Sequence, residues 1–514
     1  MARAIVVGAG LGGLSAAVEL AVRGWEVTVL DKNPEPGGRM STLEAGGYRW
    51  DVGPTLIMMP EVLQDLFAAA GRRLEDYVEL TRVDPYYRVA FGDGRHLDFT
   101  GDLPRMLAGV EAIEPGAGPR YLRFLADAER LAHRTRRAII ERPFAGARDL
   151  ARPDVLLSLL RARPASTVAG EVARHFRSAE LGRAFSFQTL YLGTPPDRAP
   201  AAYLMIPFVE ATLGVWYPRG GVHRIALGMA RLCRELGVEL RLDTPVRQIL
   251  TRGGRATGVL LDGGATEPAD VVVANAEWGY TQQHLLDRGQ RVAGRDYGCS
   301  GILFLAAVDG PLPGPHHTFL LSGDFDGNLA DLFEHRRLPR EPSIYVSRPT
   351  ASDPGLAPAG VELLYVLVPC PTLQSGVDWA REVPGFRRRV FERLTRIGLS
   401  DLDRRLLAEA VLTPETFGAR YNLTQGSAFG LAATLLQSGP FRPALRSPRY
   451  ANLYHVGASS HPGGGVPIVT LSGRMAAERI EADWGRRRRP ARRAGEQPDA
   501  PDWSAAPRDR VSST

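Results

Sequence analysis

The feature that most constrains the fold is a glycine-rich stretch near the N-terminus, in which Gly8, Gly10 and Gly13 spell G-x-G-x-x-G. A β-branched run, residues 5–7, precedes it, and apolar residues at helical spacing follow it. In such a unit the first glycine turns the chain, the second lets backbone N–H groups approach a pyrophosphate, and the third lets helix and strand pack closely. The pattern predicts a strand, a tight turn and a helix that bind a dinucleotide.

The residues after this unit indicate which dinucleotide is bound. The next predicted strand, residues 27–30, ends at Asp31, at the distance where an acid accepts hydrogen bonds from the adenosine ribose. A second glycine loop follows, carrying Gly38 and Arg39. This loop resembles the FAD-binding loop of amine-oxidase-like flavoproteins, whose arginine lies near the flavin phosphates. The combined pattern favours FAD over NAD.

Composition excludes several other classes of protein. A chain of 514 residues with 44% apolar and 23% charged residues predicts two or three globular domains. Its three cysteines are odd in number and far apart, which argues against disulfides and for a reducing compartment, and no metal-ligand spacing is present. The six arginines at 486–489, 492 and 493 account for the whole formal net charge of +6, so nucleic acid is not an expected partner. Glycine, proline and glutamate interrupt both long apolar stretches, so no membrane span is expected.

The order of segments predicts an α/β fold with α+β inserts. A Rossmann-like FAD-binding domain, discontinuous in sequence, is expected from residues 1–60, 211–295 and 441–483. Residues 61–210 are mostly helical in pattern and form an expected substrate region that associates with a membrane through an amphipathic surface. Residues 296–440 contain strand-like runs suited to a mixed sheet that roofs a substrate cavity. The arginine-rich tail, residues 484–514, is expected to be disordered.

Six motifs together resemble the bacterial-type phytoene desaturase family, the FAD-dependent carotenoid desaturases and oxidoreductases of the amine-oxidase-like flavoprotein superfamily. The resemblance covers residues 1–483. The motifs are, in chain order, "VVGAGLGGLSAAVELAVRGWEVTVLDKNPEPGGRMST", "YRWDVGPTLIMMP", "FSFQTLYLGTPPDRAPAAYLMIP", "GVWYPRGG", "YNLTQGSAFGL" and "NLYHVGASSHPGGGVPIVTLSGRMAAERI".

The resemblance implies an enzyme that removes hydrogen pairs from a long carotenoid by hydride transfer to FAD. It implies a cytoplasmic protein associated peripherally with the membrane in which its substrate dissolves, and oxygen or a quinone as electron acceptor. A hydrocarbon substrate offers no polar handle, so its site is expected to be a long apolar tunnel. The residues that could line this tunnel are Phe185, Phe187, Leu190, Tyr191, Tyr203, Met205, Ile206 and Phe208.

The residues and the resemblance together give a set of candidate site residues. Asp149 and Arg152, at i, i+3 spacing, resemble a stretch proposed to act in catalysis in the family, although such pairs are usually surface ion pairs. His461 is expected to shape the flavin's face from a loop before Pro462. The expected cofactor-binding residues are Gly8, Gly10, Leu11, Gly12, Gly13, Asp31, Lys32, Gly38, Arg39, Gly53, Pro54, Thr55, Val246, Gly457, Ala458, Pro467, Ile468 and Val469.

Several departures from the family pattern keep other functions open. The family often has glutamate in place of Asp31, and commonly threonine in place of Ser460. The same fold serves carotene isomerases and carotenoid methyl-group oxidases, and also non-enzymatic lipid carriers that have lost the nucleotide. The intact glycine fingerprint and Arg39 argue against the carrier.

Overall fold

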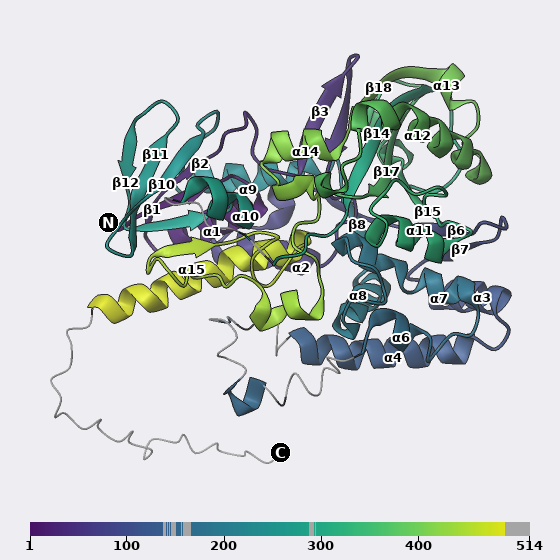
Figure 1. Ribbon diagram of the computed structural model, residues 1–514, viewed down its shortest axis with the longest axis horizontal. Coiled ribbons are helices and arrows are strands. Elements are labelled where there is room, and N and C mark those ends of the chain that lie inside the picture. Colours follow the sequence, from purple (N-terminus) through teal and green to yellow (C-terminus); the bar gives the residue numbers. More distant parts are fainter. Residues whose placement is uncertain are drawn as a thin grey trace, which may run out of the picture.

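The computed structural model describes residues 1–136, 140, 142, 144, 151–155, 157, 166–286, 292 and 294–488. Within them the chain forms two larger sheets with their own covering helices, set side by side along the long axis of the molecule (Figure 1). Three smaller sheets complete the strands. The protein is therefore a mixed α/β fold, as the sequence predicts.

The five-stranded sheet is parallel throughout and is drawn from three separated parts of the chain. Its order is β19-β13-β1-β2-β9. The strands are β1 (Arg3–Val7), β2 (Glu26–Leu30), β9 (Glu239–Arg241), β13 (Val271–Ala274) and β19 (Leu453–His455). All four residues of β13 are buried, as expected for an unbroken apolar run covered on both faces.

Different elements cover the two faces of this sheet. Three helices share one apolar core with β1, β2 and β13: α1 (Leu11–Val22), α9 (His223–Glu235) and α15 (Val466–Arg488). The other face packs against a three-stranded antiparallel sheet of β10 (Val246–Arg252), β11 (Arg255–Leu261) and β12 (Thr266–Pro268). Together these layers bring the predicted glycine turn and the C-terminal glycine segment onto neighbouring elements.

The seven-stranded sheet is mixed and has the order β18-β14-β17-β16-β15-β6-β7. Its strands are β6 (Tyr87–Ala90), β7 (His96–Phe99), β14 (Ser300–Asp309), β15 (His317–Leu320), β16 (Ile344–Ser347), β17 (Val361–Cys370) and β18 (Leu406–Leu412). Helix α12 (Trp379–Leu394) covers one face, and an aromatic core fills the other. The sequence predicts β14, β16 and β17 at these places.

The segment 61–210 is less helical than the sequence analysis expects. Strands β6 and β7 belong to the second sheet, and β5 (Leu80–Val83) pairs with β8 (Val215–Pro218). In residues 86–99, "YYRVAFGDGRHLDF", apolar and polar residues alternate around a Gly-Asp-Gly turn, which is the signature of a hairpin. β6 then pairs in parallel with β15, so the helical segment and the sheet segment share one layer.

The remaining elements connect these layers. The strands are β3 (Ser41–Ala45) and β4 (Tyr48–Val52). The helices are α2 (Pro60–Ala69), α3 (Leu103–Ile113), α4 (Gly118–Thr135), α6 (Val168–Val172), α7 (Ala179–Ala184), α8 (Met205–Leu213), α10 (Trp278–Tyr280), α11 (Phe325–Phe333), α13 (Leu402–Arg405) and α14 (Pro414–Tyr421). Short turns of helix are η1 (Leu74–Asp76), η4 (Phe187–Leu192), η5 (Ala201–Leu204), η6 (Thr281–Leu285), η7 (Pro349–Ala351), η8 (Pro354–Leu356), η9 (Leu373–Ser375), η10 (Thr395–Ile397), η11 (Thr424–Gly426), η12 (Leu435–Gln437) and η13 (Gly439–Phe441).

Two expectations concern membrane contact and the C-terminal tail. Among the helices described, none combines the length and the apolar character needed to cross a bilayer. Helix α15 continues to Arg488, so the tail expected from residue 484 begins as helix. Residues 489–514 lie outside the described residues, as do residues 156 and 158–165 of the amphipathic stretch expected over 152–176.

Candidate functional site

One continuous cavity of about 840 Å³ joins the two sheets. At one end its walls are the turns that follow β1 and β2, beginning at Gly8 and Asp31. This is the carboxyl edge of a parallel sheet, where open α/β sheets bind ligands. At the other end its walls are aromatic and aliphatic side chains of η4, α8 and the second sheet.

Nearly all predicted cofactor-binding residues line this cavity. They are Gly8, Gly10, Leu11, Gly12, Asp31, Lys32, Gly38, Arg39, Gly53, Pro54, Thr55, Val246, Gly457, Ala458, Pro467, Ile468 and Val469. Gly13 does not line it. A Cβ on Gly13 would lie 2.1 Å from the carbonyl oxygen of Gly8, so its role is the close packing of α1 against β1.

The start of α1 forms a cradle of backbone atoms. The helix begins at Leu11, its N-cap is Gly10, and no side chain caps it. A Cβ on Gly12 would lie 3.1 Å from the backbone nitrogen of Gly457 and 3.2 Å from the carbonyl oxygen of Val469. The N-terminal turn and the C-terminal glycine segment therefore meet at backbone distance, and the uncapped N–H groups of α1 are suited to an anion.

Asp31 is held at the end of β2 by its own loop. Its Oδ2 accepts a hydrogen bond of 2.7 Å from the Ala9 N–H, and its Oδ1 one of 2.8 Å from the Asn33 N–H. Burial raises the pKa of this carboxyl, and the two backbone donors oppose the shift. Next to it the Lys32 ammonium donates to Asn422 Oδ1 at 2.7 Å, which ties this edge of the cavity to the segment after α14.

The partly buried guanidinium of Arg39 completes a site that fits a dinucleotide diphosphate. Its Nη1 donates to the carbonyl oxygen of Ala428 at 2.6 Å. Burial lowers its pKa and nearby Glu277 opposes that shift, while arginine stays charged throughout the accessible pH range. A partly buried cation beside an uncapped helix start and an acid at the second strand is the donor and acceptor set that FAD requires, so the residues present fit this cofactor.

Sequence reasoning missed Asn275 and Glu277, which follow β13 and also line the cavity. Asn275 Nδ2 donates to the carbonyl oxygen of Gly8 at 3.2 Å. Glu277 Oε2 accepts from the Tyr280 N–H at 2.9 Å and from the Thr424 hydroxyl at 2.5 Å. Their position in the chain could have identified them. β13 lies next to β1 in the parallel sheet, so polar residues directly after β13 lie at the same sheet edge as the glycine turn after β1.

The apolar end of the cavity contains most of the predicted tunnel residues. Phe187, Leu190, Tyr191, Tyr203, Met205 and Ile206 line it. Phe185 and Phe208 do not, because both pack into the core beside it. The Phe185 ring stacks on Phe176 with a centroid distance of 4.6 Å, which places it one layer behind the wall.

Three aromatic residues of the second sheet were missed as lining residues: Phe319, Tyr345 and Tyr365. The centroid of the Phe319 ring lies 4.6 Å from those of both Phe187 and Tyr345. The predicted strands place these side chains in a sheet, but only the tertiary fold decides that this face meets η4 rather than solvent. We call Phe187, Tyr191, Phe319 and Tyr345 the aromatic wall.

A buried acid lies behind the aromatic wall. Glu210 on α8 is almost fully enclosed, and its Oε2 accepts a hydrogen bond of 2.7 Å from the Tyr87 hydroxyl. Burial raises the pKa of Glu210 to about 8, with Tyr87 opposing the shift. The side chain is thus largely neutral at pH 7, so the wall carries little charge there.

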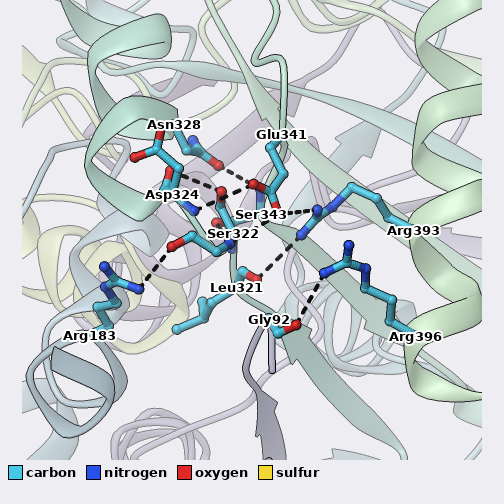
Figure 2. Close-up of polar contacts among 11 residues, drawn as sticks. Gly92, Arg183, Leu321, Ser322, Asp324, Asn328, Glu341, Ser343, Arg393 and Arg396 are labelled. Carbon is cyan, nitrogen blue, oxygen red and sulfur yellow. Dashed lines mark hydrogen bonds and ion pairs between the residues drawn. The ribbon is translucent and has the colours of Figure 1, made fainter. Parts of the chain in front are cut away.

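A polar network fixes the loop after β15, which closes the far end of the cavity (Figure 2). Leu321 and Ser343 both line the cavity. The Ser322 N–H donates to Ser343 Oγ at 3.0 Å, and Arg393 of α12 bonds both the carbonyl oxygen of Leu321, at 3.4 Å, and the carboxylate of Glu341. The loop is therefore anchored to helix and sheet rather than free to open.

Of the predicted catalytic pair, only Arg152 lies among the described residues. Arg152 does not line the cavity, its side chain is 59% exposed, and its ion pair is with Asp154 at 3.5 Å. Asp149 lies outside the described residues. His461 is buried beside the cavity rather than in its wall, its Nε2 lies 2.8 Å from the carbonyl oxygen of Arg142, and burial lowers its pKa to about 4. It therefore fixes a loop, while the adjacent Pro462 lines the cavity.

Comparison with solved structures shows the fold. An oxidoreductase from Methanosarcina mazei superposes with a TM-score of 0.64 at 19% identity, covering 93% of this chain and 100% of that one. Putrescine oxidase bound to putrescine gives a TM-score of 0.62 at 16% identity, covering 94% and 99%. At this identity the likeness extends to the fold alone.

Comparison of sequences shows the family. The model of the family described as flavin containing amine oxidoreductase matches residues 11–481. A zeta-carotene-forming phytoene desaturase of Myxococcus xanthus is 41% identical, over 93% of both chains. A 4,4'-diapolycopene oxygenase of Methylomonas is 34% identical over 94% of this chain and 98% of its own, and a 4,4'-diapophytoene desaturase of Staphylococcus haemolyticus 34% over 93% and 98%. The chain belongs to the flavin-containing amine oxidoreductases, within their phytoene-desaturase-type branch of FAD-dependent carotenoid enzymes.

Proposed function

We propose that this protein is an FAD-dependent carotenoid desaturase that removes hydrogen pairs from a long apolar polyene. The observation that carries the proposal is the continuity of one cavity, which joins a dinucleotide-binding end at Gly8 and Asp31 to an aromatic end at Phe187 and Tyr345. A cofactor bound at one end thus adjoins a hydrocarbon bound at the other.

We assign the cofactor contacts as follows. Asp31 accepts hydrogen bonds from the ribose, while Arg39 and the start of α1 hold the diphosphate. The backbone from Gly457 to the start of α15 lies against the flavin ring, where any larger side chain would block cofactor and substrate. Residues 1–60, 211–295 and 441–483 then form the FAD-binding domain, and residues 61–210 and 296–440 enclose the substrate.

FAD, when bound, supplies the acceptor for a hydride from an allylic carbon of the polyene. The chain's residues exclude water from that carbon and hold the polyene flat against the aromatic wall. Loss of a hydride leaves positive charge on the polyene, and the ring faces of Phe187, Phe319 and Tyr345 stabilise a cation placed over them.

The names of the relatives point to the substrate class. The relatives at 41% and 34% identity are named for acting on phytoene and diapophytoene, which are linear polyenes with few conjugated bonds. We infer that the substrate here is of this class. A second candidate, oxidation at a terminal methyl group, is favoured by the 34% identity to a diapolycopene oxygenase.

We infer that the cavity opens toward a lipid surface at η12. Leu435 lines the cavity and is 41% exposed, and its neighbour Leu436 is 72% exposed. Exposed leucines beside an apolar entrance suit a peripheral membrane protein that takes its substrate from the bilayer. A quinone from the same bilayer, or oxygen, would then reoxidise the flavin.

Co-expression with a phytoene-producing pathway tests the function. The proposed desaturase gives products whose absorption is shifted to longer wavelength and whose mass falls by two hydrogens for each double bond. An isomerase would change absorption without changing mass, and a methyl oxidase would add oxygen. Absorption and mass that stay those of phytoene and of other partly saturated carotenes would overturn the proposal.

A further inference from the structure

A chain of hydrogen bonds leads from the cavity wall into the second sheet. Thr55 and Tyr345 both line the cavity, and their hydroxyl oxygens lie 2.5 Å apart. The Tyr345 hydroxyl oxygen also lies 2.8 Å from Nδ1 of His317. A cavity-lining hydroxyl is thereby connected to a buried imidazole through one phenol.

The fold fixes the positions of all three groups. Thr55 follows the Gly53–Pro54 turn after β4, while His317 and Tyr345 lie on the paired strands β15 and β16. The Tyr345 ring stacks on Phe319 in the aromatic wall, with centroids 4.6 Å apart. His317 is fully buried, and burial holds its pKa well below the usual value, so its ring is neutral before the reaction and holds an added proton only weakly.

A second buried histidine, His316, lies next to His317. The two imidazole centroids lie 4.0 Å apart, and His316 Nδ1 lies 2.8 Å from Oγ of the exposed residue Ser352. Among the residues the structure describes, Nε2 of each histidine makes no hydrogen bond. Both nitrogens could therefore bind a proton, but within the described residues no hydrogen bond joins the two rings.

The proposed reaction creates a need for such a path. One C–H bond gives up its hydride to the flavin, and the neighbouring C–H bond must then release a proton while its electron pair becomes the second bond of the new C=C. An allylic cation is a very strong acid, so a weak base is enough to accept this proton. The aromatic wall offers few acceptors, and Arg152, the described member of the predicted pair, does not line the cavity.

We propose that Thr55 and Tyr345 accept the proton released in desaturation. His317 positions the Tyr345 hydroxyl and takes up its proton. The proton joins the Thr55 oxygen, the Thr55 hydroxyl proton passes to the Tyr345 oxygen, and the phenolic proton passes to Nδ1 of His317. His317 carries its own proton on Nε2 beforehand and passes one on toward His316 afterwards. The inference rests on the proposed desaturase function.

The test compares kcat, KM and the effect of D₂O on kcat for FAD-loaded wild type and variants with a phytoene-type substrate. Wild type is expected to turn over more slowly in D₂O. Y345F is expected to lower kcat tenfold or more, to change KM less than twofold and to lose the D₂O effect. H317N keeps a hydrogen-bond acceptor near the position of Nδ1 but cannot take up the proton. It is expected to change kcat, KM and the D₂O effect as Y345F does, while retaining the FAD content and melting temperature of wild type.

Two further variants separate the relay from a merely structural effect. T55V is expected to lower kcat and T55S to restore it, because only the hydroxyl is required. Y365F removes another cavity-lining hydroxyl, bonded to the carbonyl oxygen of Gly53 at 2.9 Å, and is expected to keep the D₂O effect of wild type. If Y345F fails to fold, T55V and H317N carry the test.

A decrease in kcat of less than threefold in Y345F, or in T55V and H317N where Y345F does not fold, overturns the relay. So does a D₂O effect in those variants as large as in wild type, or its absence from wild type. Failure of the proposed function is a distinct result, in which wild type itself forms no desaturated product from any carotene.

Discussion

Tyr87 donates a hydrogen bond of 2.7 Å to Glu210 directly behind the aromatic wall, in a place where neither side chain reaches solvent. The pairing makes the acid a pH-dependent element of stability. Burial raises the pKa of Glu210 from 4.5 to about 8, so at neutral pH the folded protein holds a proton that the unfolded chain has released.

The first prediction follows from the sign of this shift. Below pH 4.5 the carboxyl is protonated in both states, and between pH 4.5 and about 8 only the unfolded chain ionises, so the free energy of unfolding falls with rising pH. E210Q should therefore gain stability relative to wild type across this range, by up to about 1.4 kcal/mol per pH unit. Urea titrations at pH 4.5, 6 and 8 measure it. Parallel pH profiles for the two proteins would contradict it.

The second prediction concerns the backbone cradle at α1. G12A places a Cβ 2.9 Å from Asn275 Oδ1 and 3.1 Å from the Gly457 nitrogen, so the start of α1 must shift from the C-terminal glycine segment. FAD retained per chain should fall, and the Kd for FAD added back should rise at least tenfold, as flavin fluorescence quenching reports. G182A, whose Cβ would meet nothing within 4 Å in α7, is the matched control and should load FAD like wild type. Equal loading of G12A and G182A would contradict the cradle.

The third prediction concerns the entrance. L436D places a charge at a side chain that is 72% exposed, so folding should be unaffected while binding to a lipid surface weakens several-fold. Co-sedimentation with liposomes measures this. L407D, on β18 away from the cavity lining and at a side chain 49% exposed, is the control and should bind as wild type does. Equal loss in both variants would indicate a general charge effect rather than an entrance.

The fourth prediction concerns the aromatic wall. F319L keeps an apolar side chain but removes the π face that stabilises positive charge on the polyene, a contribution of about 0.5–2 kcal/mol. The value of kcat should fall about two- to thirtyfold. F185L makes the same change in the core layer behind the wall. It should mainly lower the melting temperature, with little change in kcat. A kcat for F319L equal to that of wild type would show that the wall provides shape alone.

The cofactor end of the site could be predicted from sequence because its chemistry is local. Gly8, Gly10, Asp31 and Arg39 lie within one strand-turn-helix-strand unit and its loop, where spacing along the chain fixes spacing in space. Gly13 lies in the same motif, yet it packs α1 against Gly8 instead of lining the cavity. A sequence motif predicts the structural unit more reliably than it predicts which residues of the motif contact the ligand.

The substrate end could be predicted only in part, because it is assembled from segments far apart in the chain. Phe187 and Tyr191 were expected from one apolar stretch, while Phe319 and Tyr345 meet them only because β15 and β16 pack against η4. The helical pattern expected for residues 61–210 does not predict the β6–β7 hairpin, although the alternation around Gly92 and Gly94 indicates strands. Periodicity predicts the element, and tertiary packing decides which of its faces forms the wall.

The central claim is that flavin reduction and polyene desaturation are one event at the two ends of one cavity. Anaerobic mixing of FAD-loaded protein with a phytoene-type carotene in liposomes tests it in a single turnover. Bleaching of the oxidised flavin absorption should match the product formed, with one flavin reduced for each double bond and a loss of two hydrogens by mass. Product of unchanged mass, product with added oxygen, or flavin that stays oxidised while the polyene changes would contradict the account.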